Sequence, residues 1–220
     1  MEKHFYKSTG ISLILGSLLI IATMILHPSG GSIKYIIKIA GIITGAHALA
    51  IFSLPFVTFG FYGLTFRLLD KWKLSVLAFI IITFGLIAAM FAALFNGLVL
   101  PRFLSRYSER LAENMEVLKP ITNFSFAVNA PLDYIFIVAC CLSILIYSLL
   151  ILVEKQFPRW VGWLGIFITL LSIIGGLTGF MFISLTGFRI FTFSIATWIL
   201  ASGVYLCIFG MSTPTKAPTA

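Results

Sequence analysis

The sequence predicts an all-α, polytopic membrane protein, a six-transmembrane-helix bundle with one amphipathic interfacial helix between the third and fourth spans. Three observations predict this class. Of the 220 residues, 60% are hydrophobic and only 10% are charged, which is too few to cover the surface of a soluble domain. The apolar runs are long and unbroken, as in membrane helices, whereas the strands of a barrel would alternate. At roughly 20 apolar residues per crossing, the chain has room for about six spans.

The apolar sequence is divided by Pro and Gly residues that end helices and by clusters of basic residues. We expect one transmembrane domain over residues 1–211 and a disordered tail over residues 212–220. The spans are predicted at residues 9–27, 41–69, 74–100, 130–153, 160–184 and 188–211. The first span resembles a signal peptide, but no small-residue cleavage site follows it, so we expect an uncleaved helix.

Residues 101–119 form the one clearly polar segment. Apolar side chains recur there at intervals of three and four residues, at Leu104, Tyr107, Leu111, Met115 and Leu118. This spacing predicts an amphipathic helix. Its Arg and Glu residues nearly balance, which argues against a detector of anionic lipids. We expect the helix to lie over the mouth of the bundle or along the membrane interface, and its pattern is compatible with a lid.

The net charge of +8 would favour nucleic-acid binding in a soluble protein. Here the basic residues flank the apolar spans instead, as they do in membrane proteins, so no nucleic-acid partner is expected. The two faces carry similar numbers of basic residues, but those on the face of the termini lie in short turns. We therefore predict a multi-pass protein of the cell inner (plasma) membrane, surrounded by the lipid bilayer, with both termini cytoplasmic.

Five polar residues lie in apolar surroundings at the same predicted depth. They are His27, His47, Asn96, Asn129 and Asp133. Polar groups at membrane depth are costly, and they usually face the interior of the bundle or a wet cavity. Asn129 and Asp133 share a helix face because they are four residues apart. The sequence therefore predicts a candidate polar pocket near the outer face, built from several helices.

Two interpretations give this pocket a chemical role. Two imidazoles and a carboxylate can bind a divalent metal such as zinc and leave a position for water. His27, His47 and Asp133 are therefore candidate metal ligands, and a metal-bound water is a nucleophile near neutral pH. The same groups can instead relay protons.

Each of the five residues also has a purely structural interpretation. His27 and Asp133 fall at predicted helix ends whose dipoles suit them, and Asn129 is a natural N-cap. His47 and Asn96 can each form a hydrogen bond to a neighbouring helix. These structural roles and the pocket remain alternatives at the level of sequence.

No glycine-rich phosphate loop, CxxC pair or Ser nucleophile elbow occurs in the sequence, so no catalytic residue is assigned. Three candidate functions are compatible with the sequence. The first is a non-enzymatic integral membrane protein that binds a lipid, a small apolar ligand or a membrane-protein partner. The second is a metal-dependent membrane enzyme that uses His27, His47 and Asp133. The third is a small transporter or proton-coupled carrier, which is weakened because no charged residue lies near the predicted midplane.

Short motifs along the chain also resemble a known group of proteins. The first span ends in His27-Pro28, the second contains Ala46-His47-Ala48-Leu49 and Gly60-x-x-Gly63-Leu64, and the fifth opens with Pro158-Arg159-Trp160-x-Gly162-x-x-Gly165. This pattern resembles small six-helix bacterial integral membrane proteins that are grouped as a domain of unknown function. The resemblance spans most of the chain and implies a six-helix fold and an inner-membrane location. It implies no activity and no catalytic residues.

Overall fold

The computed structural model describes residues 2–69, 73–153 and 157–211, and every regular element within them is a helix. Six helical segments of this part are long and apolar enough to cross a membrane: Lys3–Leu26, Ala40–Leu69, Leu74–Ser105, Ser108–Val153, Arg159–Leu177 and Leu185–Met211. The predicted all-α class with six spans is confirmed, and the chain is an integral membrane protein. The predicted disordered tail, residues 212–220, lies outside the described residues.

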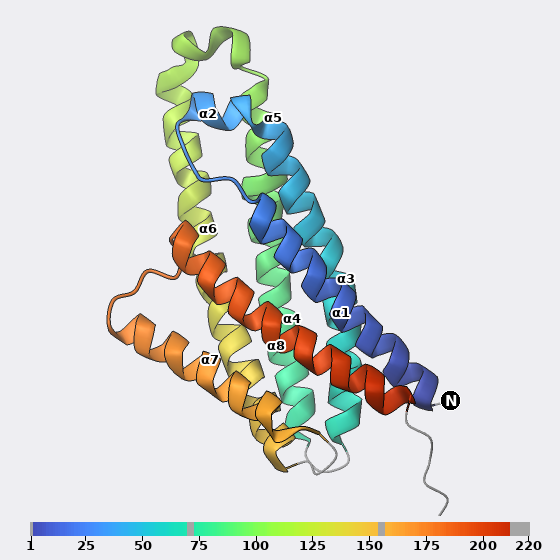
Figure 1. Cartoon of the computed structure of the whole chain (residues 1–220). Coiled ribbons are helices and arrows are strands. Elements are labelled where there is room, and N and C mark those ends of the chain that lie inside the picture. The colour runs from blue at the N-terminus through green and yellow to red at the C-terminus, as the bar shows by residue number, and fades with distance from the viewer. Residues whose placement is uncertain (1, 70–72, 154–156, 212–220) are drawn as a thin grey trace, which may run out of the picture.

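The elements are α1 (Glu2–Leu26), α2 (Ile33–Lys38), α3 (Ala40–Leu69), α4 (Leu74–Ala92), the π-helix η1 (Ala93–Val99), α5 (Leu100–Ser105), the 3-10 helix η2 (Ser108–Arg110), α6 (Leu111–Val153), α7 (Arg159–Leu177) and α8 (Leu185–Met211). Helix α1 packs against α3 and α8, α4 packs against α6, and α6 packs against α7. The beginning of α1 and the end of α8 lie at the same end of the bundle (Figure 1), as an even number of crossings requires.

Helices α1 and α8 approach one another at backbone distance. A Cβ atom built on Gly10 of α1 would lie 2.6 Å from the backbone nitrogen of Cys207 and 2.8 Å from the carbonyl oxygen of Gly203. Neither neighbour is a side chain that could turn away. Small residues at such crossings are the usual way in which membrane helices gain close packing, because lipid supplies no hydrophobic driving force between helices.

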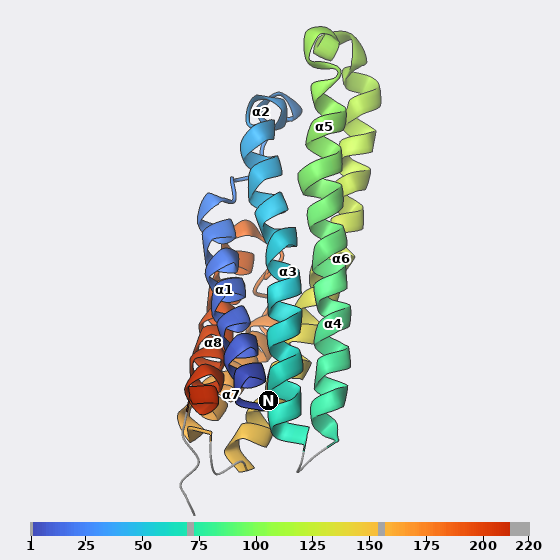
Figure 2. The ribbon, with the colours of Figure 1, turned by 90° about the vertical axis from the view of Figure 1, so that its right-hand side faces the viewer.

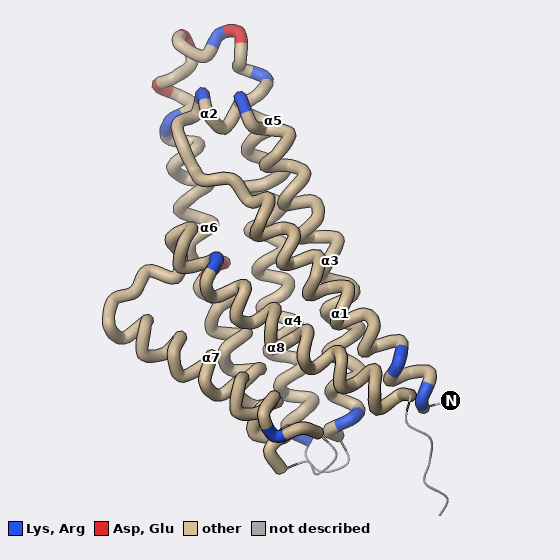
Figure 3. The backbone as a smooth tube through the Cα atoms, viewed as in Figure 1, with Lys and Arg blue, Asp and Glu red and all other residues tan. Residues whose placement is uncertain are grey.

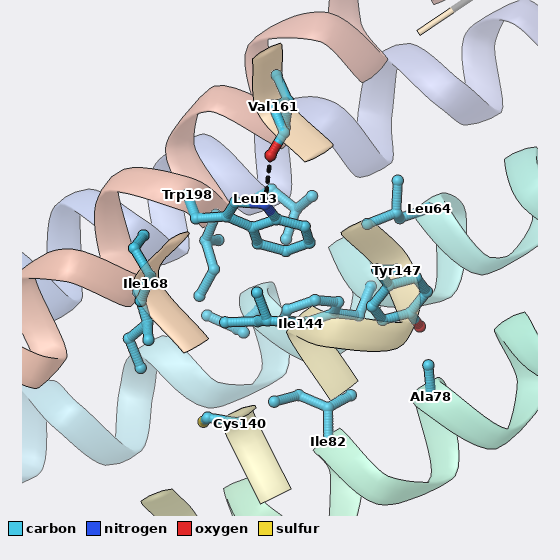
Figure 4. Close-up of a cluster of buried hydrophobic side chains, with 14 of the residues drawn as sticks. Leu13, Leu64, Ala78, Ile82, Cys140, Ile144, Tyr147, Val161, Ile168 and Trp198 are labelled. Atoms are coloured by element: carbon cyan, nitrogen blue, oxygen red, sulfur yellow. Dashed lines mark hydrogen bonds between the residues drawn. The ribbon is translucent and has the colours of Figure 1, made fainter. Parts of the chain in front are cut away.

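A rigid aromatic core fills the bundle toward the end that holds the beginning of α1. Trp198 of α8 and Tyr147 of α6 are fully buried there, and their ring centroids lie 6.4 Å apart. The Trp198 indole nitrogen donates a hydrogen bond to the carbonyl oxygen of Val161 at 3.0 Å (Figure 4). The hydroxyls of Tyr147 and Thr65 lie 2.7 Å apart and are hydrogen-bonded. The polar tips of both large side chains are therefore satisfied, as burial requires.

The segment predicted as an interfacial helix forms the tip of a helical hairpin. Helix α6 has 43 residues, which makes it about 64 Å long, roughly twice the thickness of a hydrocarbon core. Helix α5 and the beginning of α6 extend beyond the end of α1 and the beginning of α8 (Figure 2). The apolar side of the hairpin, including Leu104 and Leu118, packs against Ile33 and Ile36 of α2. The amphipathic pattern of residues 101–119 is thus explained by contact with α2.

Three predicted boundaries differ from the structure by seven residues or more. The first span was predicted to begin at residue 9, but α1 begins at Glu2. The span predicted to begin at residue 130 belongs to α6, which begins at Leu111 and contains Pro120 and Pro131. A proline inside a helix removes one backbone hydrogen bond, and membrane helices tolerate this loss. The span predicted to end at residue 184 ends at Leu177 in α7. Gly179 follows with φ of +85°, a conformation that ends helices and favours glycine, although the sequence stays apolar beyond it.

Most charged residues lie at the two ends of the molecule, over α2 and the hairpin at one end and near the beginnings of α1 and α7 at the other (Figure 3). Between them the surface carries many exposed apolar side chains, such as Phe84 at 66% and Phe52 at 60% exposure. This distribution matches a bilayer around the middle of the molecule, since lipid-facing side chains are apolar and charges remain near water.

Candidate functional site

A cavity of about 320 Å³ lies inside the bundle, near the end of α1. Its lining comes mainly from α1, α3, α4, η1, α6 and α8. All five polar residues singled out in the sequence line this one cavity: His27, His47, Asn96, Asn129 and Asp133. Each of the five is half-buried. The fold therefore brings together side chains that are up to about a hundred residues apart in the chain.

The two histidines lie side by side, with ring centroids 4.8 Å apart. Nδ1 of His27 is 3.0 Å from the carbonyl oxygen of Pro28, and Nδ1 of His47 is 2.8 Å from the carbonyl oxygen of Ile43. Because a carbonyl oxygen only accepts, Nδ1 carries the proton in both rings. Nε2 of each neutral ring therefore keeps a lone pair.

His27 follows the last residue of α1, and its surroundings favour the neutral ring. Burial lowers the pKa of His27, the hydrogen bond to Pro28 opposes this effect, and the positive charge of Arg189 adds to the lowering. The guanidinium of Arg189 donates a hydrogen bond to the backbone carbonyl of His27. Two neighbouring imidazoles in a partly desolvated site also repel one another when both are protonated.

The amide residues are held by hydrogen bonds on the opposite wall. Asn129 Nδ2 donates to Asp133 Oδ2, one turn further along α6. Ser125 Oγ, also on α6, donates to Asn96 Oδ1 of η1 at 2.7 Å. Asn129 is not an N-cap and Asp133 does not lie in a first turn, because α6 begins at Leu111. These two structural interpretations from the sequence were therefore wrong.

Two buried threonines of the lining were not singled out in the sequence. Thr23 of α1 and Thr192 of α8 are 2% and 3% exposed. Within the part of the chain that the structure describes, their Oγ1 atoms have no hydrogen-bond partner. A buried hydroxyl without a partner costs free energy. Thr23 lies four residues before His27 and so shares its helix face. Nothing in the sequence marked either threonine as lacking a partner, because many threonines of this chain bond the carbonyl four residues earlier.

One wall of the cavity departs from regular α-helix. Asn96 lies in the π-helix η1, a geometry that often occurs at functional sites. Thr44 Oγ1 of α3 donates to the carbonyl oxygen of Gly97 at 3.3 Å and ties η1 to α3. A Cβ atom on Gly97 would overlap Cβ and Cγ of His47. A glycine at position 97 is therefore needed for the observed place of the His47 ring.

The cavity is polar at one end and apolar at the other. Ile20, Leu54, Leu86 and Phe136 line it on the side toward the opposite membrane face. Along α6, Asp133 lies about 30 Å from Val153, which equals the thickness of a hydrocarbon core. The polar end therefore lies near one membrane boundary, and the apolar end lies within the hydrocarbon region.

A groove of about 500 Å³ adjoins the apolar end. It runs between α3 and α4 and is lined by apolar and aromatic residues together with two threonines. Leu54 and Leu86 line both the groove and the cavity. The two spaces are therefore neighbours that share these two side chains.

The predicted metal ligands are only partly assembled. Among the described residues, no group of three or more His, Cys, Asp or Glu side chains is placed to hold a metal ion. His27 and His47 lie together, and Asp133 lines the same cavity without completing such a group. The metal site stays a prediction.

No family model matches the chain, and searches of curated proteins and of solved structures also found no match. The resemblance to the six-helix family of unknown function therefore stays a prediction.

Proposed function

We propose that this protein binds a single-chain amphiphile inside the membrane, with the headgroup among the five polar residues and the chain toward Leu54 and Leu86. The observation that carries this proposal is the change in polarity along one cavity. Hydrogen-bonding side chains lie where lipid headgroups lie, and the wall becomes apolar toward the hydrocarbon region. An amphiphile has the same order of polarity.

The size and composition of the cavity support a small-molecule ligand. Ligand pockets commonly have volumes of about 300–1,000 Å³ and are mostly apolar, with a few polar groups that fix orientation. The cavity of about 320 Å³ lies at the lower end of this range. The groove beyond Leu54 and Leu86 provides further apolar space for a longer chain.

The binder is favoured over the two other functions that the sequence allows. A carrier usually has its site near the membrane midplane, whereas these polar residues lie near one boundary. A metal-dependent enzyme needs a set of ligands around the metal, and the described residues do not form a group of three. A headgroup site needs only hydrogen-bonding groups at one end of an apolar cavity.

Filling the cavity tests the proposal directly. Ala50 of α3 lines the cavity, whereas Ala48, on the same helix, is exposed. We expect Ala50→Phe to weaken binding of an alkyl-chain probe by about tenfold or more, because the new ring occupies ligand space. Ala48→Phe is the matched control and should bind as the wild type does.

The measurement is calorimetric titration of protein purified in a sterol-based detergent, which has no linear alkyl chain to compete. Dodecanol, dodecylamine and dodecanoic acid are titrated separately. Binding of at least one probe that is lost in Ala50→Phe and kept in Ala48→Phe supports the proposal. If the wild type binds none of the three, or if both variants bind alike, the proposal is wrong.

A second prediction concerns the groove. Leu54→Trp should place a bulky side chain between the cavity and the groove, because residue 54 lines both. We expect affinity for a twelve-carbon probe to fall by about tenfold while affinity for a six-carbon probe stays within about twofold. Phe52→Trp is the control, since Phe52 is 60% exposed on the same helix. An equal loss for both chain lengths would contradict the role of the groove.

A further inference from the structure

The polar end of the cavity carries several hydrogen-bond acceptors that are free to bind a donor. In the neutral rings of His27 and His47, Nε2 accepts, because Nδ1 already donates to a backbone carbonyl. Asn129 uses its amide nitrogen toward Asp133, so its amide oxygen remains an acceptor. The second carboxylate oxygen of Asp133 is an acceptor as well. The opposing donors are the amide nitrogen of Asn96, whose oxygen accepts from Ser125, the second amide hydrogen of Asn129, and the hydroxyls of Thr23 and Thr192.

The charges of the residues that line the cavity also favour a ligand that donates hydrogen bonds. Asp133 is its one acidic residue, and no Lys or Arg is among the described residues that line the cavity. Arg189 is close, but it is not part of the lining and donates to the backbone carbonyl of His27. A carboxylate or phosphate headgroup needs donors and positive charge, and it would meet the Asp133 carboxylate instead.

The buried threonines add an independent observation. Thr23 and Thr192 line the cavity, and their hydroxyl oxygens lack a partner in the described structure. Each hydroxyl oxygen can accept a hydrogen bond from a bound donor. Their demand for a partner indicates a polar ligand group at this depth.

We propose that the headgroup of the bound amphiphile is a primary ammonium, so that the ligand is a long-chain amine. An ammonium group carries three donor hydrogens and one positive charge, which suits a cavity that has imidazole lone pairs of His27 and His47 on one wall and the carboxylate of Asp133 on the opposite wall. This inference rests on the proposed function, because it names the class of amphiphile. An organic cation fits this cavity better than a metal ion, since much of the lining is apolar and no three-ligand group is present in the described residues.

The experiment compares dodecylamine, dodecanol and dodecanoic acid under the conditions described above. The three probes share one chain, so differences in affinity report the headgroup. We expect the amine to bind wild-type protein about tenfold or more tightly than the alcohol, as a hydrogen bond to a charged partner allows. The acid should bind more weakly than the alcohol.

Asp133→Asn then separates charge from shape. We expect this variant to lose the preference for the amine while its affinity for dodecanol stays within about twofold, because the side chain keeps its size. Glu116→Gln, an exposed site on the hairpin, removes one negative charge elsewhere and should leave the amine preference unchanged. Circular dichroism and size-exclusion chromatography check that both variants are folded.

The outcomes distinguish this inference from the proposed function. If alcohol and acid bind but the amine has no advantage, the ammonium assignment is wrong and the amphiphile site stands. If no probe binds, the proposed function fails as well. Zinc titrated alone is the third arm, and stoichiometric binding that is lost in His47→Gln would overturn the amine assignment in favour of a metal site.

Discussion

Gly97→Ala is expected to lower the free energy of unfolding by about 2–3 kcal/mol, as overpacking of a fitted interior does, and to abolish amphiphile binding. The added Cβ atom would overlap Cβ and Cγ of His47. The Cβ atom of His47 is fixed to the α3 backbone, so no change of rotamer relieves the overlap. Either η1 or α3 must move, and the wall that carries Asn96 and His47 then loses its geometry.

Gly45→Ala is the matched control for this variant. Gly45 lies two residues before His47 on α3, and an added Cβ there would meet nothing within 4 Å. Alanine favours a helix over glycine by about 1 kcal/mol, so this variant should be neutral or slightly more stable. Unfolding by SDS in mixed micelles, followed by circular dichroism, gives the stability, and titration with dodecylamine gives the affinity. If Gly97→Ala had the stability and affinity of the wild type, the claim that position 97 requires a glycine would be wrong.

The number of spans could be predicted because membrane thickness fixes how many apolar residues a helix needs. Helix ends were harder to predict, because a residue such as proline ends a helix in one context and lies inside a helix in another. The span predicted to begin at residue 130 begins at Leu111 instead, because α6 continues through Pro120 and Pro131. The end of α7 depends on the left-handed backbone of Gly179, and hydropathy does not register that conformation. Residues 101–119 gave the correct amphipathic pattern, but α2 was not recognised as the surface they pack against.

The meeting of the five polar residues was predictable from depth, because six spans of similar length place His27, His47, Asn96 and Asp133 at the same face. Their detailed contacts were not. The π-helix η1 shifts the facing of every residue after it, and neither this shift nor the rotation of each helix about its axis appears in a hydropathy pattern. Thr23 and Thr192 could not be found either, since only tertiary packing shows which hydroxyls lack a partner.

Trp198→Ala is expected to have the largest effect on stability, about 3–5 kcal/mol, as large-to-small changes at buried aromatic residues do. Trp198 is fully buried, contacts Tyr147 and Phe61, and donates its indole hydrogen to the Val161 carbonyl oxygen. Its removal leaves a cavity beside Phe61 and Tyr147 and deletes the hydrogen bond to the Val161 carbonyl oxygen (Figure 4). Trp163→Ala is the control, because Trp163 is 61% exposed on α7 and its contacts with lipid are replaceable.

Trp198→Ala also tests whether the aromatic core and the cavity are energetically independent. Trp198 does not line the cavity, whereas Gly97 lies directly against His47, which does. Under conditions in which Trp198→Ala remains folded, its affinity for dodecylamine should therefore stay within about threefold of wild type, because distant sites contribute almost independently. Loss of binding in a folded Trp198→Ala protein would mean that packing between α7 and α8 fixes the position of Thr192 and of the α8 wall. The cavity would then depend on the whole bundle rather than on the elements that line it.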